Sequence, residues 1–271
     1  MSLFAAGGAH LAGLASADGG GYEAPTTAEF YQPLIGSGPF SITRSCVLIL
    51  LSVAGIAWFL LATTRKAAIV PSKGQAITES VYGFIRNGVA RDIIGSHDFL
   101  RFVPMLFAMF MLILVNNLFG ITPLVQFPTM SRIGFPIALT LIVYVVYHGQ
   151  AIKKHGLVGY LKGLVPAGLP KAIVPFIFLL ELITFFVTRP LTLALRLFGN
   201  MFAGHLLLLL FITGGQYMLL HGSIGLKFAG LGSYVMAFVL TVFEALIEFL
   251  QAYIFTLLAA TYIAGALADE H

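Results

Sequence analysis

An arginine inside a long apolar run constrains the fold of this chain more than any other feature. The run extends from Val174 to Ile212, and Arg196 lies within it between leucine residues. A charge at hydrocarbon depth costs about 3 kcal/mol on insertion scales, so an ionisable residue there predicts a functional site. Arginine stays charged at any accessible pH, which excludes it as a proton relay and favours a role beside a carboxylate.

The composition indicates a polytopic integral membrane protein. The 271 residues are 59% hydrophobic and 10% charged, whereas soluble domains are about 25% charged. Lysine and arginine do not cluster on a polar domain, which argues against a nucleic-acid partner. The sequence has no CxxC pair, paired histidines or phosphate loop, so we expect no metal and no cofactor.

The apolar segments predict an all-α integral membrane protein with about five membrane helices. Residues 1–40 are expected to be a mobile tail outside the membrane, and residues 41–271 a single membrane domain. Since one span needs about 20 apolar residues, three segments fit one span each, and an amphipathic segment is expected to lie in the interface. These are the spans 46–63, 102–121 and 137–152 and the interfacial helix 72–98.

The last two apolar runs are too long for one perpendicular span. Residues 174–212 would reach about 58 Å as a helix and residues 228–268 about 61 Å, against about 30 Å of hydrocarbon. Each run is either two short spans or one tilted helix. Pro190 could break the first run, but no polar turn follows it, so we favour two long, steeply tilted helices in an antiparallel hairpin. A neighbouring protein must impose that tilt.

The basic residues predict the orientation. With five spans, ten of them fall on one side and three on the other, and the positive-inside rule makes the first side cytoplasmic. The N-terminus is then outside and the C-terminus cytoplasmic. The ten are Arg65, Lys66, Lys73, Arg86, Arg91, Arg101, Lys153, Lys154, Lys162 and Lys171, and the three are Arg44, Arg132 and Lys227.

Polar residues at membrane depth gather on the two long helices. His205 lies nine residues beyond Arg196, about 13 Å nearer the outside. On the second helix, Glu244, Glu248 and Gln251 share one stripe. A histidine and a carboxylate can relay protons near neutral pH. If the helices are antiparallel neighbours, His205 and Glu244 form an outer half-channel that ends near Arg196.

Other polar residues are predicted to have structural roles or to lie in loops. Asn116 and Asn117 are expected to join helices by hydrogen bonds, and Arg189 to be structural or to snorkel toward the membrane interface. His148 is expected at a loop or interface, and the basic segment 153–171 is expected to be a loop.

Two segments resemble subunit a of the F-type ATP synthase membrane sector. They are RPLTLALRLFGNMFAGH at residues 189–205 and FEALIEFLQAYIFTLLAATYI at residues 243–263. The resemblance implies proton translocation through two offset half-channels against a rotating c-ring, which couples the proton gradient to ATP synthesis or hydrolysis. It implies a non-catalytic subunit in a bacterial plasma membrane, and it leaves open whether the coupling ion is H⁺ or Na⁺.

The resemblance also implies site residues and partners. Arg196 would face a carboxylate of the c-ring, with Glu248 as the candidate partner within the chain. Glu181, about 22 Å inward of Arg196, is a candidate for the inner half-channel. Expected partners are the c-ring, peripheral-stalk b subunits, other ATP synthase subunits and membrane lipid. The proton-path residues are Arg196, Asn200, His205, Glu244, Glu248 and Gln251.

A second hypothesis is a self-contained secondary transporter or membrane enzyme. Its substrate site would use Arg196, His205 and Glu244. An inverted repeat would favour a carrier, and the sequence has no internal repeat. A carrier transports when purified alone, whereas a stator half-channel copurifies with a ring.

Overall fold

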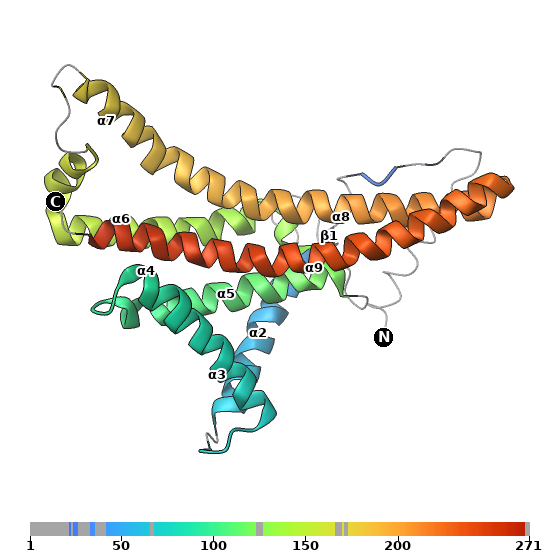
Figure 1. The fold of residues 1–271 in the computed structure, drawn as a ribbon, viewed down its shortest axis with the longest axis horizontal. Coiled ribbons are helices and arrows are strands. Elements are labelled where there is room, and N and C mark those ends of the chain that lie inside the picture. Colours follow the sequence, from blue (N-terminus) through green and yellow to red (C-terminus); the bar gives the residue numbers. More distant parts are fainter. Residues whose placement is uncertain are drawn as a thin grey trace. The chain divides into compact units, whose positions relative to one another are not determined.

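The computed structural model is almost entirely helical, which confirms the all-α class (Figure 1). It describes residues 22, 24–26, 33–35, 42–65, 68–122, 127–165, 170 and 173–268, so most of the predicted tail at residues 1–40 lies outside the described residues. Within these residues five helices are long and apolar enough to cross a membrane, as predicted. They are α2 (Arg44–Thr64), α5 (Phe99–Ile121), α6 (Gly134–Gly163), the continuous helix Val174–His221 and α9 (Ile224–Leu267).

Shorter elements connect these helices. The strands β1 (Pro33–Ile35) and β2 (Ile42–Thr43) pair antiparallel ahead of α2, and a 3-10 turn, η3 (Thr129–Ser131), precedes α6. The segment predicted as one amphipathic helix contains three successive helical elements. They are α3 (Lys73–Ile85), the π-helical turn η2 (Arg86–Arg91) and α4 (Asp92–Ile94).

The long apolar run that contains Arg196 is one helix and not two short spans. It consists of α7 (Val174–Ile183), the π-helical turn η4 (Thr184–Thr188) and α8 (Arg189–His221). A proline lacks the amide hydrogen and crowds the carbonyl group four residues earlier. The π turn directly before Pro190 adds a residue to the helical turn, and this accommodates the proline without breaking the helix.

The helix α6 extends beyond its predicted end. We expected a loop from residue 153, but helical residues continue to Gly163, across a kink at Gly156. Gly156 has φ 71° and ψ 166°, a backbone conformation that is essentially restricted to glycine. The kink redirects the chain, so that residues beyond it form a further helical turn.

The chain divides into two compact units, which are described separately. Unit 1 comprises residues 1–52, 114–132 and 199–250, and unit 2 comprises residues 53–113, 133–198 and 251–271. Within unit 1, α8 and α9 form an antiparallel hairpin, drawn in orange in Figure 1. Ser233 donates a hydrogen bond of 2.6 Å to the carbonyl oxygen of Phe211 across it. The predicted hairpin of the last two helices is therefore confirmed in this unit.

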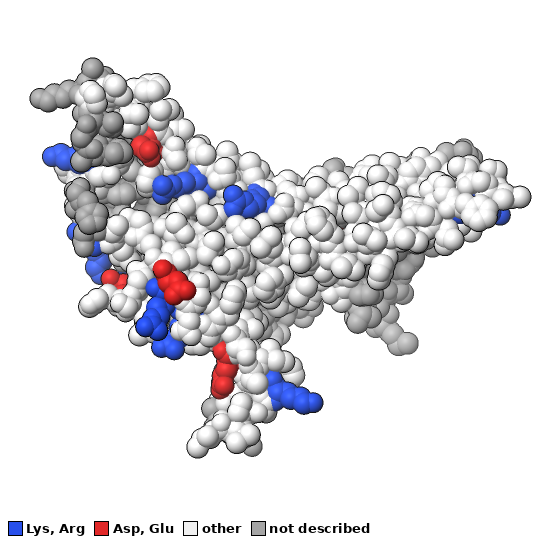
Figure 2. Space-filling model, viewed as in Figure 1, with Lys and Arg blue, Asp and Glu red and all other residues white. Residues whose placement is uncertain are grey.

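Much of the helical surface is apolar and exposed. On α2, Trp58 is 72% exposed, and on α9 Phe228 and Phe238 are 73% and 71% exposed. Figure 2 shows large areas of the drawn face without a charged side chain. Apolar surface of this extent is expected to meet lipid or a partner protein.

Candidate functional site

Arg196 lies in unit 2, on an exposed face of α8. The adjoining side of the helix is packed, because Leu193, Ala194 and Leu197 are at most 5% exposed. Within the described residues, the Arg196 guanidinium makes no ion pair or hydrogen bond with another side chain. The chain therefore presents a permanent cation on an apolar helical surface.

Arg189, seven residues before Arg196, has a different environment in the same unit. Its guanidinium carbon lies 3.5 Å from the ring centroid of Phe185 and 5.2 Å from that of Tyr262. Such cation–π contacts partly compensate a cation for lost hydration. The structural role predicted for Arg189 agrees with these contacts.

Glu244 is a buried carboxylate at the centre of the hairpin in unit 1. It is 6% exposed, and its Oε1 atom would lie 2.8 Å from a Cβ built on Gly204 of α8. Only a glycine leaves room for this approach. His205, the next residue, is 7% exposed, so the structure brings His205 and Glu244 to the same level of the hairpin.

Glu248 is the second buried carboxylate of unit 1. It is 2% exposed and lies against α5, where its Oε1 atom would be 3.1 Å from a Cβ built on Gly120. The Asn117 side chain donates a hydrogen bond of 3.2 Å to the carbonyl oxygen of Glu248. Asn117 thereby joins α5 to α9, as predicted.

The carboxylate oxygens of Glu244 and Glu248 have no hydrogen-bond partner among the described residues. Glu248 and Arg196 belong to different units, so the candidate pairing of these two residues stays a prediction. Buried polar groups are normally hydrogen-bonded, and intramembrane carboxylates commonly mark ion pathways. Two such groups one helical turn apart are therefore a candidate proton site.

Asn116 also joins helices within unit 1. Its side-chain amide donates to the Ser52 hydroxyl of α2 at 2.8 Å. Its side-chain oxygen accepts a hydrogen bond of 3.0 Å from Thr129. The predicted helix-joining role of this asparagine is confirmed.

The remaining predicted site residues lie in different surroundings. Asn200 is on an exposed face of α8 in unit 1, Gln251 is buried on α9 in unit 2, and Glu181 is half-buried on α7 in unit 2. Unit 1 thus contains Asn200, His205, Glu244 and Glu248, and unit 2 contains Glu181, Arg196 and Gln251.

The prediction of a loop position for His148 was wrong. It lies inside α6 in unit 2 and is 7% exposed. Its Nδ1 atom is 2.8 Å from the Tyr160 hydroxyl, and its ring contacts Tyr144 and Tyr147. Sequence reasoning missed this cluster because α6 was expected to end sooner, although the spacing of residues 144, 147 and 148 is helical.

Comparison with known proteins identifies the family. The family model for the ATP synthase A chain matches residues 45–264. The chain belongs to this family. The match confirms the resemblance that two segments of α8 and α9 indicated.

Relatives in the family are similar over nearly the whole chain. The ATP synthase subunit a of a Nocardioides species is 44% identical over 268 residues, which cover 94% of this chain and 97% of the relative. That of Pseudarthrobacter chlorophenolicus is 43% identical over 261 residues, with coverage of 95% and 98%. That of Streptomyces lividans is 40% identical over 260 residues, with coverage of 94% and 91%.

Proposed function

We propose that this chain translocates protons in the membrane sector of an ATP synthase, as the stationary subunit beside a rotating c-ring. Membership of the ATP synthase A chain family and the relatives named ATP synthase subunit a support this function. They do not favour a self-contained transporter or membrane enzyme. ATP itself is then made or hydrolysed in other subunits of the complex.

The observation that carries the proposal is the exposed cation on an apolar helix. A charge in hydrocarbon is costly, and Arg196 makes no ion pair within the described residues. Its partner is therefore expected to come from another chain. A carboxylate on each c subunit meets this need, because it pairs with Arg196 when ionised and can enter lipid when protonated.

The buried carboxylates serve proton uptake from the outer side. Glu244 and His205 lie at one level of the hairpin, and together they can pass protons toward a c-ring carboxylate. Glu248, Asn200 and Gln251 contribute further polar positions to this path. After nearly a full rotation, the carboxylate returns and releases its proton to the inner half-channel, for which Glu181 is a candidate. A membrane potential supplies about 2.3 kcal/mol per charge per 100 mV.

The partners of this chain include other ATP synthase subunits. We propose the c-ring at Arg196, peripheral-stalk b subunits, and lipid over the apolar surfaces of α2 and α9. We propose that the complex lies in the bacterial plasma membrane, with the N-terminus of this chain outside and its C-terminus in the cytoplasm.

The variant Arg196→Ala tests the proposal. We expect ATP-driven proton pumping to fall to background, because the c-ring carboxylate loses the cation that keeps it ionised. Pumping is measured by quenching of a pH-sensitive dye in inverted membrane vesicles, with the amounts of this chain and of c subunit determined in the same vesicles. Arg101→Ala, at an exposed position of α5, is the matched control and should pump normally.

Normal ATP-driven pumping by Arg196→Ala would overturn the proposal. Proton transport by this chain reconstituted alone, without c subunits, would instead favour the carrier hypothesis.

A further inference from the structure

We propose that His148 and Tyr160, in a cluster that includes Tyr147, form a proton-release relay, which delivers protons to a cavity at the cytoplasmic ends of α6 and α9. The proposal rests on the proposed function and assigns the inner release path to these residues rather than to Glu181. All the residues that carry it belong to unit 2.

His148 has the geometry of a relay group. It is 7% exposed, its Nδ1 atom is 2.8 Å from the Tyr160 hydroxyl, and its Nε2 atom has no hydrogen-bond partner among the described residues. Since a histidine held for packing alone normally has its buried nitrogens satisfied, the open Nε2 indicates a transient partner. In either tautomer this nitrogen can exchange a proton with a water molecule.

Aromatic side chains hold the His148 ring in place. The ring is stacked on Phe186 of η4, with centroids 4.7 Å apart and an angle of 25° between the planes. Tyr144 and Tyr147 contact it from the same helix, each at 4.1 Å. These contacts orient the ring so that Nδ1 is directed at Tyr160.

The π turn connects this cluster to the arginine helix. A π-helical turn frees backbone carbonyl groups from the regular pattern, and the Tyr147 hydroxyl donates a hydrogen bond of 2.9 Å to the carbonyl oxygen of Phe185. Arg189 contacts the Phe185 ring from α8 and Tyr262 from α9. Arg189 lies about 10 Å inward of Arg196 along the helix, so the cluster follows Arg196 on the inner side.

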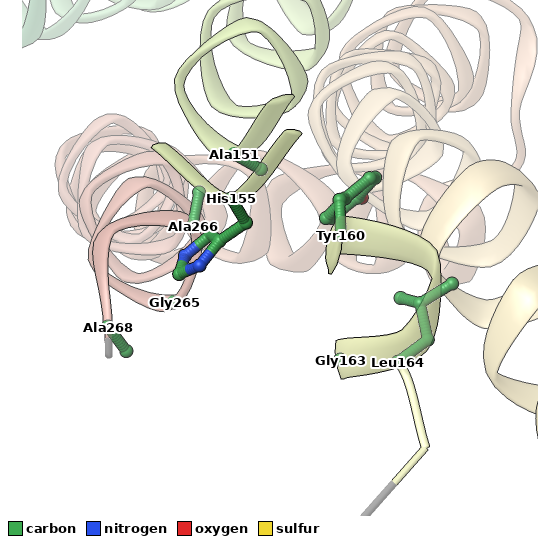
Figure 3. Close-up of a pocket in the computed structure, with 8 residues that line it drawn as sticks. All are labelled: Ala151, His155, Tyr160, Gly163, Leu164, Gly265, Ala266 and Ala268. Atoms are coloured by element: carbon green, nitrogen blue, oxygen red, sulfur yellow. The ribbon is translucent and has the colours of Figure 1, made fainter. Parts of the chain in front are cut away.

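A cavity lies beyond Tyr160. Its volume is about 180 Å³, enough for several water molecules. Figure 3 shows the Tyr160 and His155 side chains around it, together with Gly265 and Ala266 at the end of α9 and Ala268 just after it. Tyr160 thus borders both His148 and a space that can hold water.

Basic residues lie next to the cavity in the sequence. Lys153, Lys154 and Lys162 flank its lining residues in α6, and Lys154 donates a hydrogen bond to the carbonyl oxygen of Leu267 at the end of α9. The charge distribution makes this side cytoplasmic. Protons that reach the cavity are therefore released inward.

The relay step transfers protons only and changes no oxidation state. The relay starts from the tautomer with the proton on Nδ1, which donates to the Tyr160 oxygen. Water gives a proton to Nε2, the imidazolium passes its Nδ1 proton to the Tyr160 oxygen, and the Tyr160 hydroxyl proton leaves to a cavity water, so one proton enters and one leaves. His148 is left with its proton on Nε2, and the ring turns about the Cβ–Cγ bond and exchanges its proton with water before it accepts the next one.

The first test compares His148→Gln with His97→Gln, an exposed histidine outside the membrane helices. Passive proton conduction is measured in vesicles stripped of the catalytic sector, with the contents of this chain and of c subunit determined. We expect His148→Gln to conduct at least about tenfold more slowly, as for loss of a positioned proton-transfer group, and His97→Gln to conduct normally. If His148→Gln does not assemble, Tyr160→Phe removes one relay oxygen and is measured in the same way.

The second test has a readout that a packing role would not change. With Cys46→Ser as background, Ala266→Cys places a thiol at the cavity and Ala259→Cys places one at a fully buried position of α9. A water-soluble thiol reagent added to the cytoplasmic face should label Ala266→Cys and block conduction, and should leave Ala259→Cys unlabelled.

Normal conduction by assembled His148→Gln, or by assembled Tyr160→Phe, overturns the relay, as does labelling of Ala266→Cys without loss of conduction. Failure of the relay can be distinguished from failure of the proposed function, because Arg196→Ala tests the proposed function independently. If Arg196→Ala stops pumping while His148→Gln conducts normally, only the relay is wrong.

Discussion

Each buried carboxylate of α9 lies against a glycine of another helix. Glu244 meets Gly204 on α8, and Glu248 meets Gly120 on α5. A side chain at either glycine would occupy the space that the carboxylate uses. These glycines therefore set the positions of the acidic groups, although neither glycine carries a polar side chain.

Gly204→Ala is expected to lower ATP-driven proton pumping several-fold. The new methyl group would lie 2.8 Å from the Glu244 Oε1 atom, so the carboxylate must move. Because the end of a glutamate side chain is flexible, the change should cost less than the roughly 1–3 kcal/mol of a rigid overpacked core. The effect is therefore expected in pumping, measured by dye quenching in inverted vesicles, more than in assembly.

Gly232→Ala is the matched control for this substitution. It lies on α9 of the same unit, and a Cβ built there meets no atom within 4 Å. Pumping by this variant should equal that of the unsubstituted complex. Equal pumping by both variants would contradict a positioning role for Gly204.

At the scale of elements, two irregular turns decide where the polar groups of unit 2 lie. The π turn η4 accommodates Pro190 and presents the Phe185 carbonyl group to Tyr147. The kink of α6 at Gly156 returns the chain, so that Tyr160 reaches His148. A regular helix through residue 156 would carry Tyr160 away from this contact, because positions 148 and 160 would be about 18 Å apart along its axis.

Gly156→Ala should destabilise the protein by roughly 1–3 kcal/mol. Its φ of 71° and ψ of 166° form a conformation that a side chain strains by about that amount. The free energy of unfolding is compared in detergent by thermal denaturation. Gly149→Ala in the same helix is the control, because a Cβ there meets no atom within 4 Å, and its stability should be equal or higher by up to about 1 kcal/mol. Equal midpoints of thermal denaturation for Gly156→Ala and Gly149→Ala would contradict backbone strain at residue 156.

At the scale of the whole molecule, the orientation in the membrane depends on the distribution of basic residues. Ten lysines and arginines fall on one side of the five predicted spans and three on the other. By the positive-inside rule we expect the side with ten to face the cytoplasm. The direction of proton flow that we propose past Glu244 and past Tyr160 depends on this expected orientation.

Two single-cysteine variants test the orientation. Ser223→Cys lies between α8 and α9, and Ser96→Cys lies between α4 and α5. Both serines are exposed, and the background is Cys46→Ser. A membrane-impermeant maleimide should label Ser223→Cys in intact spheroplasts and Ser96→Cys only in inverted vesicles. The opposite pattern would reverse the assigned orientation.

The sequence alone determined the features that depend on composition and helical period. The number of consecutive apolar residues sets how far a helix reaches across the membrane, so the five membrane helices and the long final hairpin were predictable. The position of Arg196 was predictable as well, because a charge inside an apolar run is rare and costly. The pairing of His205 with Glu244 by depth was also a sequence prediction, since position along a helix scales with residue number.

Only the tertiary structure decided which groups approach one another. The contacts of Glu248 with Gly120, of Tyr147 with the Phe185 carbonyl and of His148 with Tyr160 depend on helix rotation, on a π turn and on a glycine kink. A shift of one residue at such a turn rotates the following side chains by about 100°, and hydrophobic periodicity does not record it. The sequence therefore predicts which polar residues lie at membrane depth, and the packing of the helices determines their partners.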